Sequence, residues 1–207
     1  VIKKYNLNRE QIDLINRYIL KLTKSNQRHN LVGPSTLDVA WDRHINDSLQ
    51  LSEFILKKNA SIIDFGTGAG LPGVILHIFG HSNILLIDSK MKKINFIKEF
   101  AQEQSLEIKT ICTRVEKIKN QKFDFIVCRA FAPLAKLLDY SEDINTIDIS
   151  AFPDKWDLAK KSDYLLKISD LAKKLLIDCL GTYFAKFLNF SLLFPRLLEK
   201  KVFIFFS

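Results

Sequence analysis

The stretch DFGTGAGLPG, residues 64–73, begins with a carboxylate and holds four of the seven glycines of the chain. It follows the apolar run SIIDF (61–65), which predicts a buried strand, and LPGVILHIF predicts a helix with Pro72 near its first turn. A glycine-rich turn between a strand and a helix lets main-chain amides approach a ligand at the helix N-terminus. We therefore expect a ligand at this loop, with a tight ligand-free turn as the alternative.

Two glycine patterns overlap in this loop. Gly68, Gly70 and Gly73 spell G-x-G-x-x-G, the dinucleotide fingerprint. Asp64, Gly66, Gly68 and Gly70 spell D-x-G-x-G-x-G, which resembles motif I of S-adenosylmethionine (SAM) methyltransferases. The turn begins directly after SIIDF, so Gly66 is the first glycine of the loop, and this favours the second pattern. Asp64 also favours it, because a carboxylate can hold an ammonium group and would repel a pyrophosphate.

A second carboxylate ends the next predicted strand. NILLI (83–87) is followed by Asp88, at a position where a carboxylate can accept two hydrogen bonds from ribose hydroxyls. A dinucleotide and SAM both contain that ribose. Asp88 therefore predicts a cofactor that contains a nucleoside, without deciding between the two.

Strands alternate with helices from about residue 60 onward. The predicted strands are 61–65, 83–87, 107–112 and 123–128, and an amphipathic helix is expected at 90–104. Pro133 begins a further predicted helix. This alternation is typical of a doubly wound, mostly parallel α/β sheet.

The residues before this alternation predict helices. Asn8 and Gln11 have the spacing of a capping box. The apolar positions that follow recur at helical spacing: Ile12, Ile15, Ile19 and Leu22. A second helical stretch is expected from Ser35 to about Lys57. The domain organisation that we expect is a helical segment over 1–58, a Rossmann-like core over 59–170 and an atypical, apolar, Phe-rich tail over 171–207.

Composition limits the classes of function. The chain has 31 basic and 23 acidic residues, a net charge of +8 and a pI near 9.3, so its surface attracts polyanions, nucleic acid above all. Its three cysteines (Cys112, Cys128, Cys179) form no C-x-x-C pair, and its histidines show no ligand spacing. We therefore expect reduced thiols and no metal site. The start of the chain has no apolar run of the kind found in signal peptides, and we expect a cytoplasmic monomer without a transmembrane segment.

Six motifs together point to one family. RHNLVG, RHINDSL, DFGTGAGLPG, LIDSKMKK, TRVEKI and FIVCRAFAPL occur in an order and spacing that resemble the RsmG (GidB) family, over roughly residues 10–140. The resemblance implies a class I SAM-dependent methyltransferase that modifies N7 of a guanine in 16S rRNA. It also implies the small ribosomal subunit, or an assembly intermediate of it, as the partner. Guanine N7 carries a lone pair at neutral pH, so this reaction needs alignment of the reactants and no general base.

The resemblance also implies particular contacts. Cofactor contacts carry over to Gly66, Leu71, Val115, Glu116 and Arg129, which join Asp64, Gly68, Gly70 and Asp88 as the expected cofactor-binding residues. No catalytic residue is assigned, and the candidates near the substrate are Arg43, His44 and Arg129. On spacing alone, Arg43 and Asp47 predict an ion-paired turn of helix.

The sequence departs from the family pattern after about Tyr140. The tripeptide L-K-G that we expect of the family does not occur, although YLLKISD (164–170) is similar to its late strand. This departure leaves open a catalytically impaired RNA-binding or ribosome-binding homologue with a vestigial SAM site. An NAD(P)-binding oxidoreductase is the further alternative.

Overall fold

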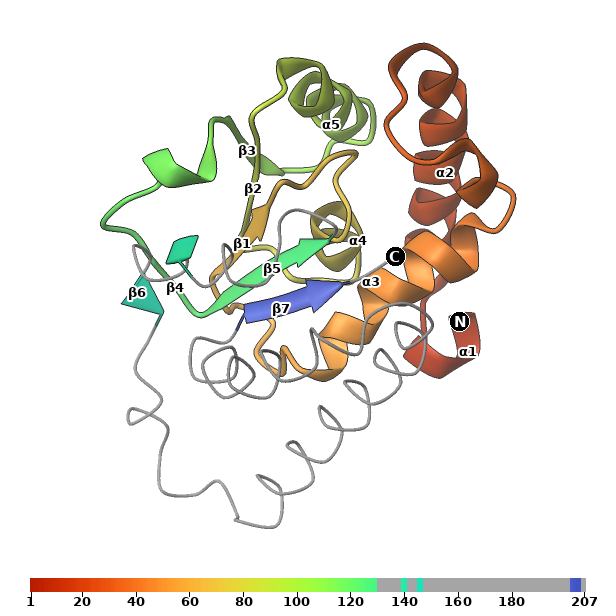
Figure 1. Cartoon of the computed structure of the whole chain (residues 1–207). Helices are drawn as coiled ribbons and strands as arrows, with labels where there is room; N and C mark the ends of the chain where they lie inside the picture. Colours follow the sequence, from red (N-terminus) through yellow and green to blue (C-terminus); the bar gives the residue numbers. More distant parts are fainter. Residues whose placement is uncertain (130–138, 141–144, 147–201, 206–207) are drawn as a thin grey trace, which may run out of the picture.

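The computed structural model describes residues 1–129, 139–140, 145–146 and 202–205. The helices that position the site are α1 (Ile2–Tyr5), α2 (Arg9–His29), α3 (Asp47–Gln50), α4 (Gly73–Ile78) and α5 (Met91–Glu103). The strands are β1 (Ile62–Phe65), β2 (Ile84–Asp88), β3 (Lys109–Cys112), β4 (Lys122–Phe123), β5 (Phe125–Arg129), β6 (Asn145–Thr146) and β7 (Val202–Phe205). Figure 1 shows the sheet beside the N-terminal helices.

The central sheet is parallel and has the strand order β3-β2-β1-β5-β7, while β4 and β6 form a separate pair. Phe65 pairs with Ile87 of β2 and with Cys128 of β5. The residues that follow these two partners, Asp88 and Arg129, therefore lie at the same edge of the sheet as the end of β1. The predicted strands and the expected Rossmann-like α/β fold are confirmed.

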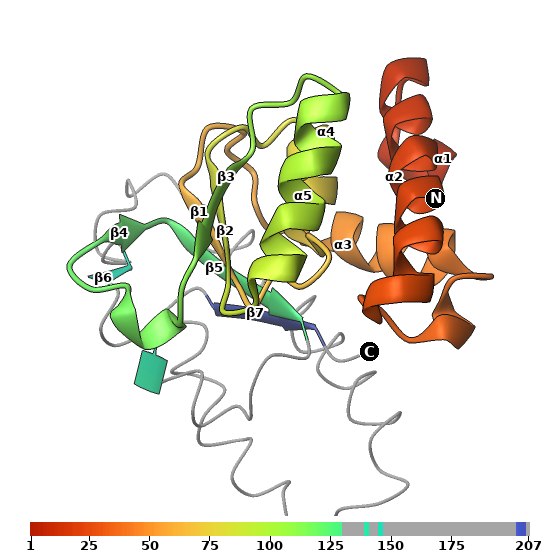
Figure 2. The same ribbon diagram turned by 90° about the horizontal axis from the view of Figure 1, so that it is seen from above.

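The buried side chains of β1 divide between the two faces of the sheet, because successive side chains of a strand point to opposite sides. Ile62 belongs to the larger core, with α2, α4 and α5, whereas Ile63 and Phe65 pack with Val115, Ile118 and Phe123 on the other face. In Figure 2, α4 and α5 lie between the sheet and α2, and both of these helices contact α2. The N-terminal segment is thus a further layer over the helices of the core.

Helix α2 begins where its capping residues predict. The Asn8 side chain accepts a hydrogen bond from the Gln11 amide (2.8 Å), and the Gln11 side chain accepts one from the Asn8 amide (3.1 Å). The two bonds satisfy donors that a helix N-terminus leaves without partners. Ile15, Tyr18 and Leu22 are the buried apolar residues of the helix and form its contact with the core.

The helical stretch expected from Ser35 to about Lys57 is confirmed over residues 41–53, but it is not one regular α-helix. The structure has a 3₁₀ turn at Pro34–Thr36, a π-helix at Trp41–Asn46, the one-turn helix α3 and another 3₁₀ turn at Leu51–Glu53. A π-helix widens the turn by one residue, so side chains four positions apart are not stacked as in an α-helix. Accordingly, the ion pairs of the described chain include none between Arg43 and Asp47.

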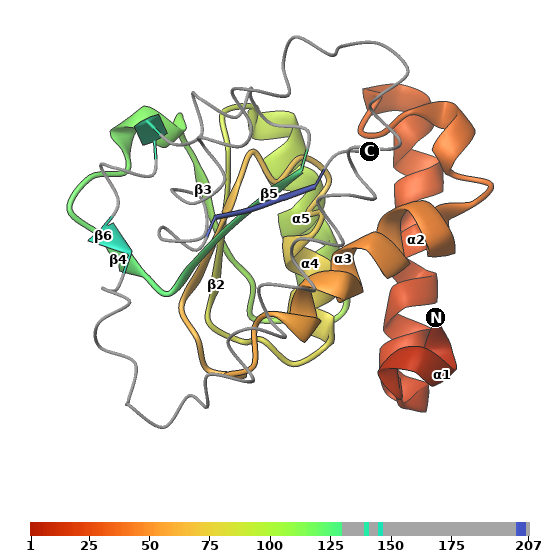
Figure 3. The same cartoon turned by 60° about the horizontal axis from the view of Figure 1, so that its bottom comes forward.

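Part of the expected tail contributes a strand to the central sheet. Residues 202–205 form β7, which lies parallel to β5 with Phe205 opposite Arg129 (Figure 3). The predicted helix at Pro133, the strand-like run 164–170 and most of the tail lie outside the described residues. In the part of the chain that the structure describes, no helix is both long and apolar enough to cross a membrane.

Candidate functional site

Three ionisable side chains come together because parallel strands end at one edge of the sheet. Asp64 lies within β1, while Asp88 and Arg129 are the last residues of β2 and β5, the two strands that pair with β1. Electrostatic coupling joins Asp64 to both of the others. The loop between β1 and α4 passes over this edge, as expected for a ligand site of an open α/β sheet.

Asp64 is a buried carboxylate with one satisfied oxygen and one unsatisfied oxygen. Its Oδ2 atom accepts hydrogen bonds from the Thr67 hydroxyl (2.6 Å) and the Gly73 amide (2.9 Å), whereas Oδ1 has no partner among the described residues. Burial raises the pKa of Asp64 to about 7, although the two hydrogen bonds and Arg129 act in the opposite direction. A buried acceptor without a partner is costly to fold, so Oδ1 is a candidate acceptor for a donor from a ligand or from water.

The glycines of the loop serve two different purposes. Gly66, Gly68 and Gly70 have positive φ values (62°, 60° and 96°), which other residues rarely adopt. A Cβ atom on Gly73 would lie 2.7 Å from Asp64 Oδ2, and one on Gly70 would collide with Val74. In contrast, a Cβ atom on Gly68 would have no heavy atom closer than 3.7 Å. Gly70 and Gly73 therefore allow the loop and α4 to pack closely, whereas a Cβ atom on Gly68 would make only ordinary contacts, with Lys93 Nζ and the Gly66 carbonyl.

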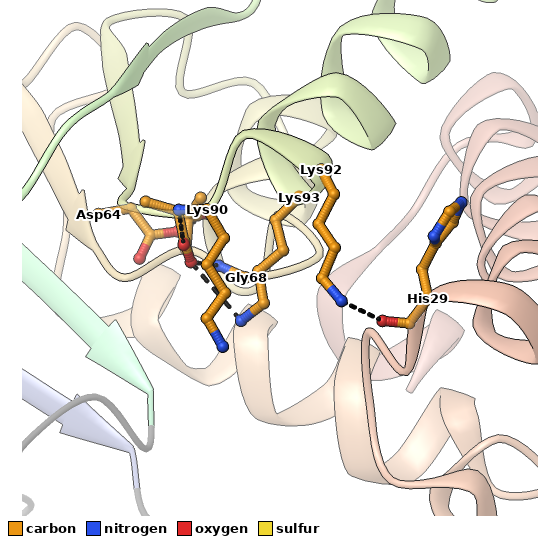
Figure 4. Close-up of polar contacts among 8 residues, drawn as sticks. His29, Asp64, Gly68, Lys90, Lys92 and Lys93 are labelled. Carbon is orange, nitrogen blue, oxygen red and sulfur yellow. Dashed lines mark hydrogen bonds and ion pairs between the residues drawn. The ribbon is translucent and has the colours of Figure 1, made fainter.

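Asp88 is held by main-chain donors from the glycine loop and from the residue before α5. Its two oxygens accept hydrogen bonds from the amides of Gly68 (3.1 Å) and Lys90 (2.8 Å), and Lys93 Nζ lies 3.7 Å from Oδ2. Figure 4 shows Lys93 extending toward the loop at Gly68, while Lys92 reaches the main-chain carbonyl of His29. A carboxylate has about four acceptor positions, so Asp88 can still receive further donors.

Arg129 contacts the π-helix. Its Nη1 atom lies 2.9 Å from His44 Nδ1 and 3.3 Å from the carbonyl oxygen of Arg43. Burial lowers the pKa of Arg129, with Tyr18, Asp47 and Asp64 acting against this shift. The structure therefore brings together Arg43, His44 and Arg129, the three candidates for the neighbourhood of the substrate.

The remaining sequence-predicted contacts have different surroundings. Leu71 is buried in the larger core and Val115 in the smaller one, so each can reach a ligand at this edge only through its main chain. Glu116 is exposed and accepts a hydrogen bond from the Tyr140 hydroxyl (2.9 Å). Glu116 lies in a 3₁₀ turn after β3, the strand that pairs with β2.

Sequence reasoning missed two residues that shape the loop. The Tyr18 hydroxyl, fully buried, donates a hydrogen bond to the carbonyl of Ala69 (2.9 Å), so α2 holds the loop directly. Thr67 closes the turn by its bond to Asp64. The buried stripe of α2 places Tyr18 toward the core, but nothing in that pattern indicates which carbonyl its hydroxyl meets. No cluster of potential metal ligands occurs in the described part of the chain.

Comparisons with known proteins identify the family of this chain. The family model "GidB: rRNA small subunit methyltransferase G" matches residues 11–148. A ribosomal RNA small subunit methyltransferase G of Orientia tsutsugamushi (strain Ikeda) is 38% identical over 144 residues, which are 70% of this chain and 72% of that protein. The protein of the same name from Rickettsia typhi is 32% identical over 171 residues, 83% of this chain and 84% of that protein.

Among solved structures, the magnesium protoporphyrin IX methyltransferase of Synechocystis PCC 6803 with bound SAM is similar, with a TM-score of 0.47 at 11% identity. The similarity covers 62% of this chain and 72% of that one. The family match spans the glycine loop, both carboxylates and Arg129, which are the residues assembled at the edge of the sheet. This chain belongs to the GidB family of rRNA small subunit methyltransferases G.

Proposed function

We propose that this protein is a SAM-dependent methyltransferase that methylates N7 of a guanine in the 16S rRNA of the small ribosomal subunit. The observation that carries the proposal is the pair of buried carboxylates, Asp64 and Asp88, on either side of the glycine loop in a chain of this family. A dinucleotide fits this arrangement less well, because Asp64 would repel a pyrophosphate and Gly73 is required by packing against Asp64 itself.

The residues present fit SAM. Oδ1 of Asp64, which has no partner among the described residues, suits an ammonium group, and Gly68 has no side chain that would keep a ligand from the main chain. Asp88, at the end of β2, retains acceptor positions for ribose hydroxyls. Arg129 has no hydrogen-bond partner for Nε or Nη2 among the described residues, so it suits the carboxylate of the same amino acid.

SAM supplies a methyl group activated by its attachment to a sulfonium. Asp64 and Arg129 hold the two charged groups of its amino acid, and Asp88 fixes the ribose, so the protein sets the direction in which that methyl group points. Fixing the reactants in this way supplies much of the rate enhancement for a displacement that requires alignment. In the cofactor-free protein, burial raises the pKa of Asp64 to about 7 and so favours its protonated form relative to an exposed aspartate, whereas the ammonium group favours the ionised form.

The surroundings of His44 agree with a target that needs no general base. Burial, with Arg129 second, lowers the pKa of His44 to about 4, and both ring nitrogens already have partners. A guanine N7 that attacks through its own lone pair requires no proton acceptor. An A-form helix presents N7 in a major groove too deep and narrow for protein side chains, so the target guanine must be unpaired or flipped.

Basic residues beside the site suit the phosphates of the RNA. Lys90, Lys92 and Lys98 are exposed on α5 and the residue before it, and the Lys90 amide donates a hydrogen bond to Asp88 beside the loop. The net charge of +8 favours association with a polyanion in general. These lysines supply affinity that is independent of sequence, whereas the choice of guanine depends on how the subunit presents it.

The test supplies methyl-labelled SAM together with small subunits from a strain that lacks its own copy of this methyltransferase. We expect one label per subunit, located at N7 of a guanine, which borohydride reduction and aniline cleavage identify. Naked 16S rRNA in a parallel reaction shows whether the assembled subunit is required. Asp88→Ala, which lacks the ribose acceptor, is the control and should transfer no label. Bound SAM without transfer to any rRNA would indicate a vestigial site and refute the proposal.

A further inference from the structure

The side chains of Arg129, His44 and Thr36 form a chain of hydrogen bonds that ends on the main chain. Arg129 Nη1 lies 2.9 Å from His44 Nδ1, and His44 Nε2 lies 2.8 Å from Thr36 Oγ1. Thr36 Oγ1 in turn donates to the carbonyl of Gly33 (2.7 Å). His44 belongs to the π-helix and is only 4% exposed, so water contributes little to its hydrogen bonding.

The donors and acceptors of this chain allow one arrangement of protons. A guanidinium can only donate, so Nδ1 of His44 must be the acceptor. The single hydroxyl proton of Thr36 is directed to Gly33, so Thr36 must accept the proton of Nε2. His44 is therefore the neutral tautomer with hydrogen on Nε2. Arg129 and Arg43, the charged groups that act on its ring, both disfavour a second proton.

We propose that His44 and Thr36 are positioning residues for cofactor binding. They hold the Arg129 guanidinium so that its Nε and Nη2 groups, which have no partner among the described residues, meet the carboxylate of the SAM amino acid. The proposal rests on the proposed function and assigns His44 no role in proton transfer. Its basis is that His44 presents a fixed lone pair to Arg129 and that Thr36 fixes the tautomer. Arg129 is also coupled to Asp64, so the two sites carry opposite charges that match an amino acid zwitterion.

The π-helix explains how His44 reaches Arg129. Its first residue follows the 3₁₀ turn that contains Thr36, and its last residue precedes α3. Ser48, in α3, donates a hydrogen bond to the main-chain carbonyl of His44 (2.6 Å), which fixes the backbone from which the imidazole projects. Wide turns of this kind occur frequently at functional sites. Here the turn supplies both the imidazole and the Arg43 carbonyl that Arg129 contacts.

The experiment compares His44→Gln with His44→Asn. The amide oxygen of asparagine can occupy the position of Nδ1 and accept from Arg129, whereas the amide of glutamine corresponds to Nε2 and leaves Arg129 without its acceptor. Titration calorimetry measures the binding of S-adenosylhomocysteine and of 5′-methylthioadenosine, which lacks the amino acid. For S-adenosylhomocysteine, we expect a loss of affinity of about tenfold in His44→Gln and no more than about threefold in His44→Asn. Binding of 5′-methylthioadenosine should not change in either variant.

A double-mutant cycle completes the test. In an Arg129→Ala background, His44→Gln should cause no further loss, because the residue that it positions is absent. Three results for His44→Gln would each overturn the positioning role. These are an equal loss of affinity for the two ligands, wild-type affinity for S-adenosylhomocysteine, and an undiminished effect in the Arg129→Ala background. A wild-type protein that binds neither ligand would instead refute the proposed function, and this proposal with it.

Discussion

Gly73 is the glycine for which the structure predicts the largest effect on stability. Gly73→Ala would place a Cβ atom 2.7 Å from Asp64 Oδ2 and 2.8 Å from Leu86 Cγ, closer than real Cβ contacts. Neither neighbour is a flexible chain end, because Asp64 is fixed by Thr67 and by the Gly73 amide, and Leu86 lies in the central sheet. The added methyl group must therefore move α4 away from the sheet or break the bonds to Asp64.

The expected magnitude follows from two opposing effects. Overpacking of a buried site costs about 1–3 kcal/mol. Replacing glycine restricts the unfolded chain and offsets roughly 0.4–1 kcal/mol of that cost. We expect the free energy of unfolding to fall by about 1–2 kcal/mol, which corresponds to a decrease in Tm of roughly 2–8 °C for a chain of this size.

Gly33→Ala is the matched control. A Cβ atom there would make only ordinary contact, 3.7 Å from Thr36 Cγ2, and φ is −59°, which alanine adopts freely. The control should raise the free energy of unfolding by up to about 1 kcal/mol. Urea denaturation followed by circular dichroism measures both variants. The reasoning fails if Gly73→Ala is as stable as the control, because close packing would then not account for this glycine.

Three further predictions concern the site. Tyr18→Phe removes the bond to Ala69 and leaves a buried carbonyl without its donor, so stability should fall by about 1–3 kcal/mol in thermal unfolding; an unchanged Tm would contradict it. Asp88→Asn should weaken SAM binding by at least about tenfold in calorimetry, since an amide accepts fewer ribose hydrogen bonds than a carboxylate; wild-type affinity would argue against ribose binding there. At pH 6.5 the Asp64 carboxyl, with its pKa of about 7, should release a proton when SAM binds, and Asp64→Asn should release none. Calorimetry in two buffers of different ionisation enthalpy measures that release, and equal values for the two proteins would refute the assignment.

The sign of the last prediction follows from the surroundings of Asp64. Burial raises the pKa above its ordinary value of 3.8, with Asp88 adding to this shift and Arg129 opposing it. Between pH 3.8 and about pH 7, the pKa values of Asp64 in the unfolded and folded chain, the folded protein binds more protons than the unfolded chain. The free energy of unfolding therefore falls as the pH rises through this interval. The ammonium group of bound SAM beside Asp64 favours the ionised carboxylate, so Asp64 releases its proton to the buffer when SAM binds.

Local signals predicted the parts of the fold that depend on neighbours in sequence. Asn8 and Gln11 fixed the start of α2, because a capping box involves residues three positions apart. Asp64 and Asp88 could be placed at one edge of the sheet, because parallel strands of an alternating α/β pattern end together. In the same way, Arg129 directly follows the predicted strand 123–128 and is the last residue of β5.

Features that depend on distant contacts could not be predicted. The π-helix at Trp41–Asn46 reads as an ordinary helix in sequence, because both present side chains with a period near four. The four glycines of the loop likewise look equivalent, although a Cβ atom would collide with Val74 at Gly70 and with Asp64 at Gly73 and would make ordinary contacts at Gly68. These distinctions are set by the packing of α4 on the sheet.

The position of β7 at the edge of the central sheet affects how freely the sequence of residues 202–205 can vary. Without β7, strand β5 would present unpaired main-chain groups next to Arg129, and such an edge attracts other strands. The bonds that join β7 to β5 are between main-chain atoms, so they impose little requirement on which side chains the strand carries. The sequence Val-Phe-Ile-Phe consists of residue types that favour extended chains. Many unrelated segments of similar character could therefore cover this edge, and divergence there is compatible with an intact site on the neighbouring strands.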